Sequence, residues 1–191
     1  MGRFKCLVNS EENKEKFRAK YRIHPTVGMR YAAQREWVDD RKEGEVVIPM
    51  TAFIEGGMTI PMGTITRNFL RFFRLSPTQY SQNMFRVLGS IEALNERMNL
   101  ELTHHDVNWL YNLYHLKGQR YYLKSRYPEV RLIQYLPTSN KGLKEDILIF
   151  SGEWHDGLPC PIEEGKLGGG LILNLCTMAC ISVFVSHYFR F

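Results

Sequence analysis

Residues 52–99 read AFIEGGMTIPMGTITRNFLRFFRLSPTQYSQNMFRVLGSIEALNERMN. This stretch has the clearest turn and helix-capping signals in the chain and the clearest periodicity of apolar residues. Gly56-Gly57 indicates a turn, because glycine adopts positive φ at little steric cost. Three apolar residues then alternate with other residues and indicate a short extended segment: Met58, Ile60 and Met62. Pro61 places this segment at the edge of a sheet or at the start of a helix.

Two helices joined by a corner are predicted in the second half of the stretch. The first begins with Thr64 as its capping residue and ends near Phe73. Its apolar positions have helical spacing and are Ile65, Phe69, Phe72 and Phe73. The second runs from Asn83 to about Met98. Its apolar stripe consists of Met84, Val87, Leu88, Ile91, Leu94 and Met98. We interpret both stripes as core packing, with a ligand groove as the alternative.

Ser76-Pro77-Thr78-Gln79 forms the corner and starts a short helical turn that should stop near Ser81. Serine is a good capping residue, proline fits the first helical position and glutamine completes a capping box. The corner therefore sets the angle between the two longer helices.

The first 50 residues are predicted to form one helix and an irregular lead-in. Residues 9–22 fit an amphipathic helix capped by Asn9 or Ser10, with acidic residues in its first turn and basic residues near its end. Phe17 and Tyr21 form its narrow apolar face. Residues 25–45 fit either strand or helix followed by a solvated loop, with Trp37 as a packing anchor.

After Met98 the sequence predicts one more helix. The spacing of apolar residues then changes from helical to the alternation typical of strands. Thr103 caps this helix, Asp106 occupies the capping-box position and Gly118 ends it. Three short strands follow at residues 121–124, 131–136 and 146–152, and the short connections between them favour an antiparallel meander. We therefore expect an α+β fold, in which mainly helical N-terminal two-thirds pack with a small antiparallel β-meander and an apolar C-terminal tail follows.

The sequence divides into three segments. Residues 1–50 are the N-terminal helix and lead-in, 51–167 the α+β domain, and 168–191 a Gly-rich hinge with an apolar tail. Leu171–Phe189 is mostly apolar and close to the minimum length of a membrane-spanning helix. Three interpretations stay open: a membrane anchor, a strand or helix packed on the domain, and a non-native tail. The first predicts a membrane protein, and the other two a cytoplasmic or nuclear one.

The composition is that of one globular domain. The chain has 191 residues, of which 44% are hydrophobic and 13% aromatic. Its net charge of +5 permits contact with nucleic acid or an acidic surface, but the acidic residues are interspersed and no basic block stands out. The four cysteines form no CxxC pair, which favours reduced thiols over a disulfide framework.

His104-His105-Asp106 is one candidate for metal or general-base chemistry. Adjacent histidines on a helix point about 100° apart and chelate one ion poorly. We favour a helix start with one exposed and one packed histidine. The sequence also has no phosphate loop, no GxGxxG and no GxSxG.

His155 and Cys160 form the other candidate, since an enzyme would need these two side chains within hydrogen-bond reach. The glycine and proline between them indicate a plain loop instead. Cys176 and Cys180 lack the further ligands of a zinc site. We therefore predict a non-enzymatic protein without catalytic residues, cofactor or bound metal.

Basic residues interleaved with aromatic ones on the central helices are candidates for nucleic-acid contact: Arg67, Arg71, Arg74 and Arg86. The alternative is a solvated helix face.

A series of motifs runs through the central stretch and beyond it. A glycine at position 57 precedes an apolar-Pro segment and a helix, followed by a Leu-x-Pro-x-Gln step at 75–79 and an Asn-x-aromatic-Arg-x-Leu step at 83–88. With these motifs the chain resembles the plant gypsy-type transposon, or retrotransposon gag-like, domain family over about Phe17 to Gly169. Family members commonly have Pro and Trp where this chain has Gln82 and Phe85, and the tail after Gly170 matches nothing in the family.

The resemblance implies a retrotransposon-derived gag-like protein, whose role is assembly and packaging rather than phosphoryl transfer. It implies self-association and weak, non-specific nucleic-acid binding, and it implies no catalytic residues. Two alternatives remain at this point: a small membrane protein anchored by residues 171–189, and an uncharacterised enzyme that uses His155 and Cys160.

Overall fold

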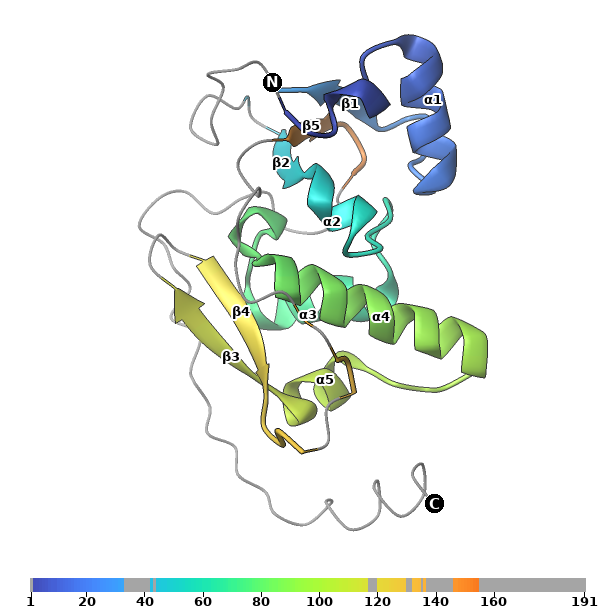
Figure 1. Ribbon diagram of the computed structural model, residues 1–191. Coiled ribbons are helices and arrows are strands. Elements are labelled where there is room, and N and C mark those ends of the chain that lie inside the picture. Colours follow the sequence, from blue (N-terminus) through green and yellow to red (C-terminus); the bar gives the residue numbers. More distant parts are fainter. Residues whose placement is uncertain are drawn as a thin grey trace.

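The computed structural model describes residues 2–32, 42, 44–116, 120–129, 132–134, 136 and 146–154 of the protein. Two antiparallel sheets and several helices make up this part of the chain, which confirms the α+β class. In Figure 1 a three-stranded sheet lies at one end, a two-stranded ribbon lies toward the other, and helix α4 crosses between them. One main hydrophobic core joins these elements.

The N-terminal helix forms as the sequence predicts. A short turn, η1 (Lys5–Leu7), precedes α1 (Glu11–Lys20), and the Ser10 hydroxyl accepts a hydrogen bond from the Asn13 amide at 3.2 Å. Phe17 and Tyr21 are buried and lie with their ring centroids 5.7 and 5.9 Å from that of Phe53 in α2 (Met50–Ile54). The narrow apolar face predicted for this helix is therefore confirmed.

The three-stranded sheet has the order β1-β5-β2 and is antiparallel throughout. Its strands are β1 (Gly28–Tyr31), β5 (Ile147–Ser151) and β2 (Val46–Pro49). One face contributes Ile48, Leu148 and Phe150 to the main core, and the other face forms a small second cluster with Val47 and Ile149. The sheet thus joins strands from both sides of the predicted division at residue 50.

The predicted meander is wrong in its pairing. The strands expected at 121–124 and 146–152 exist as β4 (Arg120–Ser125) and β5, but β5 pairs with β1 and β2 and not with β4. Residues 132–134 and 136, the described part of the strand expected at 131–136, form no strand. The physical reason is that β5 is apolar on both faces, so it is most stable as a central strand covered on both sides.

The helix predicted from Thr103 is shorter than expected. The Thr103 hydroxyl accepts from the His105 amide and the Asp106 carboxylate from the Thr103 amide, which confirms the capping box. However, α5 (His104–Leu110) ends before Tyr111, and β3 (Tyr111–Leu116) replaces the expected last turns up to Gly118. Pairing of β3 with β4 satisfies the backbone groups along the edge that the two strands share, and this gain exceeds the local helical preference.

The central helices and their corner match the prediction closely. They are α3 (Thr64–Phe73), the turn η3 (Pro77–Gln79) and α4 (Gln82–Met98). The Ser76 amide donates to the Gln79 side-chain oxygen at 2.9 Å, as expected of the capping box. The Ser81 hydroxyl caps α4, so that helix begins one residue earlier than predicted.

Both predicted apolar stripes are largely buried, but their outer members are not. Phe72 is 48% exposed and Met98 is 63% exposed, while Leu70, outside the predicted stripe, is buried. In Figure 1 the last turns of α4 extend beyond the body of the molecule, which explains the exposure of Met98.

The segment between α2 and α3 shows the predicted alternation without the hydrogen bonds of a strand. Met58, Ile60 and Met62 are buried and Pro61 is exposed. Gly57 has a φ of 68°, which confirms the predicted turn.

Candidate functional site

Three of the four arginines predicted to contact nucleic acid lie on α3. Arg67, Arg71 and Arg74 are four and three residues apart, a spacing that places them along one side of a helix. Arg71 and Arg74 are exposed, and Arg67 is half-buried. Arg74 ends the helix in the left-handed conformation, with a φ of 52°. We name these three residues the α3 arginine row.

Arg86 lies on α4 and has a different environment. Its Nη2 is 3.6 Å from Oε2 of Glu55, and both side chains are partly buried. The same Glu55 carboxylate oxygen accepts a hydrogen bond from the Gln82 side-chain amide. Arg86 therefore has a charge partner within the fold, and a role in nucleic-acid contact stays a prediction for all four arginines.

His104 and His105 form part of a surface aromatic cluster rather than a metal site. Their ring centroids are 4.0 Å apart, and the Phe72 ring lies 5.5 and 5.6 Å from them. Burial, and to a smaller extent the neighbouring His105, lowers the pKa of His104. The negative charge of Asp106 raises this pKa and partly offsets the decrease. Within the described part of the chain, no three His, Cys, Asp or Glu side chains lie close enough to hold a metal ion.

The remaining sequence candidates lie outside the described residues. These are Trp37, His155, Cys160, Cys176, Cys180 and the segment 171–189. Trp154, next to His155, is buried and its indole donates to the Gly44 carbonyl at 2.9 Å, so it has a packing role. None of the described helices has the length and apolar character needed to span a membrane.

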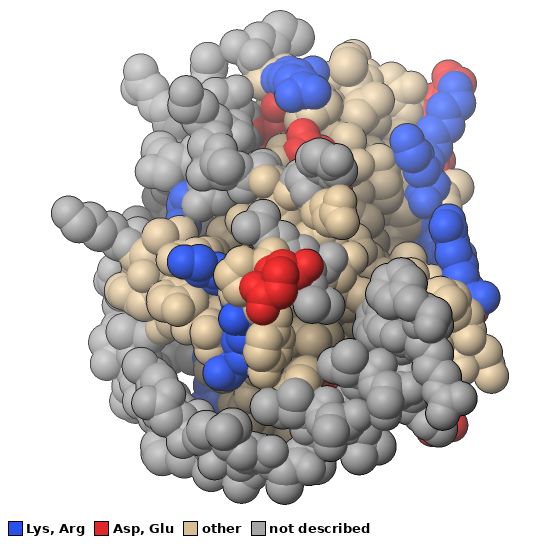
Figure 2. Space-filling model, turned by 60° about the horizontal axis from the view of Figure 1, so that its bottom comes forward, with Lys and Arg blue, Asp and Glu red and all other residues tan. Residues whose placement is uncertain are grey.

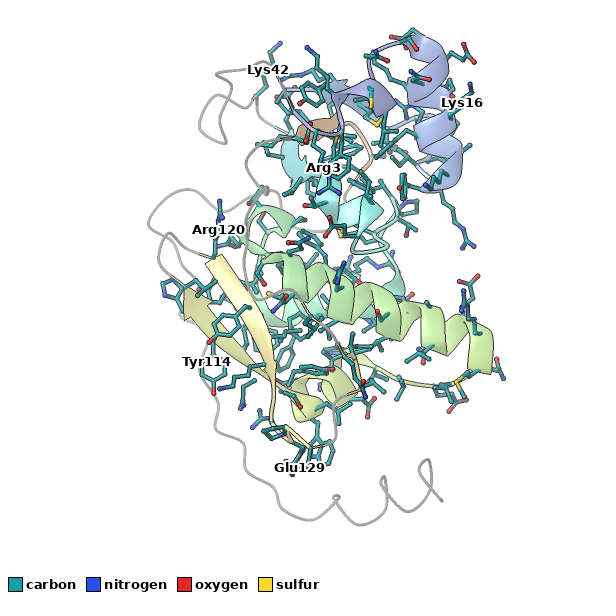
Figure 3. All side chains as sticks on the ribbon, in the orientation of Figure 1. Arg3, Lys16, Lys42, Tyr114, Arg120 and Glu129 are labelled. Carbon is teal, nitrogen blue, oxygen red and sulfur yellow. The ribbon has the colours of Figure 1, made fainter. Side chains whose placement is uncertain are left out.

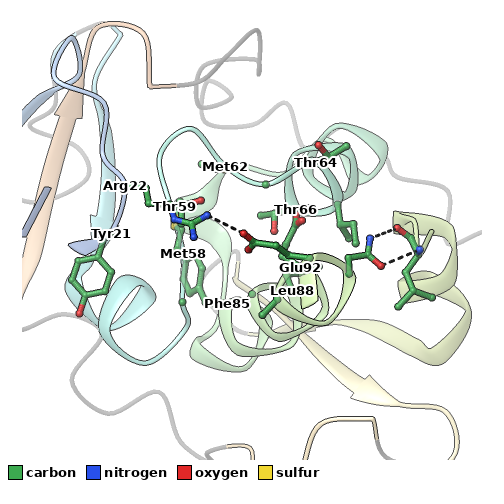
Figure 4. A pocket seen from close by; sticks show the side chains of 18 of the residues that line it. Tyr21, Arg22, Met58, Thr59, Met62, Thr64, Thr66, Phe85, Leu88 and Glu92 are labelled. Carbon is green, nitrogen blue, oxygen red and sulfur yellow. Dashed lines mark hydrogen bonds and ion pairs between the residues drawn. The ribbon is translucent and has the colours of Figure 1, made fainter. Parts of the chain in front are cut away.

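A groove of about 670 Å³ lies between the end of α1, the segment before α3 and helix α4 (Figure 4). The Glu92 carboxylate, which lines it, accepts a hydrogen bond from the Thr66 amide at 2.9 Å. Glu92 thus caps α3 from the neighbouring helix, and the predicted cap is wrong: Gly63 is the capping position and Thr64 the first helical residue. The Thr66 amide, which could attract an anionic ligand at this helix start, is already satisfied by this carboxylate.

The charges at the rim of the groove are also used by the fold. Arg22 Nη1 lies 3.4 Å from Glu96 Oε1, and both side chains are largely exposed (Figure 4). This exposed pair contributes little to stability, and the described lining presents no convergent set of unsatisfied polar groups, so we do not assign a ligand to the groove.

The outer face of the β3–β4 ribbon is a candidate that the sequence reasoning missed. The register places three cross-strand pairs on this face: Asn112 with Lys124, Tyr114 with Tyr122, and Leu116 with Arg120. The opposite face contributes the buried Tyr111 and Leu123 to the core. We name the six residues of the three pairs the ribbon face. The residues of β3 fall within the helix that the sequence predicts up to Gly118, so this face is not expected from the sequence.

Comparison of the chain with protein-family models, with curated proteins and with solved structures found no match. Any functional interpretation therefore depends on the resemblance in the motifs and on the surfaces described above.

Proposed function

We propose that this protein is a non-enzymatic, retrotransposon-derived gag-like protein that acts by self-association and binds nucleic acid weakly and without sequence preference. The motif series between residues 57 and 88 is the starting point for this proposal. Several of its residues have packing roles: Leu75 is buried, Gln79 caps the corner, and the Phe85 ring lies 5.3 Å from that of Tyr80. These roles support a structural interpretation of the motifs rather than a catalytic one.

The observation that carries the self-association proposal is the exposure of Phe72. Nearly half of this side chain is accessible, although it lies at the centre of an aromatic cluster with Phe73, His104 and His105. Arg71 is its neighbour on α3 and is also exposed. Aromatic and arginine side chains are enriched at the centres of protein interfaces, whereas lysine and glutamate are depleted. The composition of this surface therefore suits contact with a second copy of the chain.

Sedimentation velocity of the full chain over a range of concentrations tests the proposal. We expect the wild-type protein to form a dimer or larger species as its concentration rises. Phe72→Ser should weaken this association about tenfold or more, as removal of an aromatic anchor usually does.

Met98→Ser is the matched control, because it removes an even more exposed apolar side chain from the end of α4. This variant should associate like the wild type. A wild-type chain that stays monomeric at every concentration would contradict self-association, and equal effects of the two variants would mean that Phe72 is not the contact.

A further inference from the structure

We propose that the ribbon face binds single-stranded nucleic acid, with bases stacked on Tyr114 and Tyr122 and phosphates held by Arg120 and Lys124. This inference deepens the nucleic-acid part of the proposed function and places the contact on the ribbon rather than on the α3 arginine row. It does not depend on self-association.

The two tyrosines provide a stacking platform at the centre of the ribbon face. Their ring centroids are 5.3 Å apart and their planes differ by 25°. Tyr114 is 41% exposed, and in Figure 3 its side chain points away from the helices. Bases of single strands stack on exposed aromatic rings, and this contact tolerates any sequence because every base has a flat face.

The cations flank the tyrosines along β4. Arg120 and Lys124 lie two residues before and two residues after Tyr122, so their Cα atoms are about 13 Å apart in an extended strand. Neither makes an ion pair with another described residue, and neither β3 nor β4 contains Asp or Glu. The charged residues of the ribbon face are therefore both basic, which suits a phosphate backbone.

In Figure 2 Lys and Arg side chains lie along the edge where α1 lies and also on the side of the ribbon, where acidic side chains lie beside them. On α1 the lysines at positions 14 and 16 pair with Glu11 and Glu12. The basic residues of the ribbon lack such pairing within the described residues, so they are the more available for a ligand.

A single strand fits this surface better than a duplex. Base pairing hides the base faces inside a double helix, and side chains that stand up from a flat two-stranded ribbon reach them only in unpaired segments. A cross-strand aromatic pair also stabilises a ribbon by itself, so the test must separate binding from folding.

The test measures binding of a fluorescein-labelled oligouridylate to the full chain by fluorescence anisotropy at low salt. Tyr114→Val and Tyr122→Val keep strand-favouring residues but remove the flat rings, and each should weaken binding about tenfold. Tyr114→Phe keeps a ring and should bind like the wild type. Circular dichroism of each variant shows whether the ribbon still folds.

Charge is tested separately through the salt dependence of binding. Lys124→Gln should reduce the slope of log affinity against log salt by about 0.7, the value for one phosphate contact on a single strand. Lys16→Gln on α1 removes the same charge from a distant exposed site and should leave the slope unchanged.

The outcomes that overturn the inference are distinct from those that concern self-association. Folded valine variants with unchanged affinity would overturn it, and so would loss of binding in Arg71→Gln and Arg74→Gln alone, which would assign the contact to α3. Duplex bound as tightly as single strand, or binding only to anionic lipid vesicles, would also overturn it. Sedimentation of the same variants reports on self-association independently.

Discussion

Gly63 and Glu92 show how one residue pair can define a helix start. A Cβ atom at position 63 would lie 2.3 Å from Cδ of Glu92, the carboxylate carbon that caps α3. Glycine at position 63 therefore leaves room for the capping carboxylate in this position, and it does not serve a positive φ. The missing side chain at one position and the acidic side chain at the other act as a unit.

This pairing predicts non-additive effects on stability. Glu92→Ala should lower the free energy of unfolding by about 1 kcal/mol through loss of the cap. Gly63→Ala should cost about the same, because it displaces the same carboxylate, and the double variant should cost little more than either single one. Urea denaturation of the four proteins measures the coupling. Additive losses would show that the two residues act separately.

At the scale of elements, a close backbone contact joins the turn after α2 to helix α4. A Cβ atom at Gly89 would lie 2.0 Å from the backbone oxygen of Gly56, and one at Gly56 would lie 2.5 Å from Cβ of Phe85. The two backbones can approach only because both positions lack a side chain. Gly56, which the sequence suggested as part of a turn, thus serves mainly to permit close packing.

We therefore expect Gly89→Ala to destabilise the protein, although alanine favours a helix. The gain in helix propensity is about 1 kcal/mol, whereas overpacking against a backbone atom typically costs about 1–3 kcal/mol. Ser90→Ala is the control, since it raises propensity at the next position without adding a Cβ atom. Thermal unfolding followed by circular dichroism should show a lower Tm for Gly89→Ala only. An increase in Tm would mean that the helices separate without cost.

At the scale of the whole molecule, one carboxylate joins three distant parts of the chain. Asp146, which is buried, accepts hydrogen bonds from the Tyr31 hydroxyl at 2.8 Å and from the Phe4 amide at 3.0 Å. Burial, this hydrogen bond and the negative charge of Asp146 raise the pKa of Tyr31 to about 12. The N-terminal segment, β1 and β5 are thus connected at a single point.

The raised pKa predicts how stability changes at high pH. Because the folded state holds the Tyr31 proton more tightly than the unfolded state, this contribution is complete below pH 10 and is lost as the pH rises toward 12. Tyr31→Phe should be less stable at neutral pH by about 1 kcal/mol, and the difference from the wild type should shrink above pH 10. Urea denaturation of both proteins at several pH values measures this difference in the free energy of unfolding. A difference that does not change with pH would contradict the assigned hydrogen bond.

The sequence predictions are correct where an interaction joins residues close in the sequence, and they fail where the partners are far apart in the sequence. The caps at Ser10, Ser76 and Thr103 were predicted because each closes hydrogen bonds within four residues. The cap of α3 was missed because its acceptor, Glu92, is 26 residues away from Thr66. The ribbon face was missed for the same kind of reason, since β3 becomes a strand only by pairing with β4.

The sequence by itself determined the capped starts of α1 and α5, the corner at Ser76-Pro77 and most of the buried stripes of residues 52–99. These features depend on local hydrogen bonds and on the periodicity of apolar residues. Only the tertiary structure decided that β5 lies between β1 and β2 and that Glu92 caps α3. It also decided that the ribbon face, with its two tyrosines and two basic residues, points outward. Each of these features depends on which distant segments bury each other's surfaces. The free energy of this burial is gained only when the whole fold assembles, and no short stretch of the chain supplies it alone.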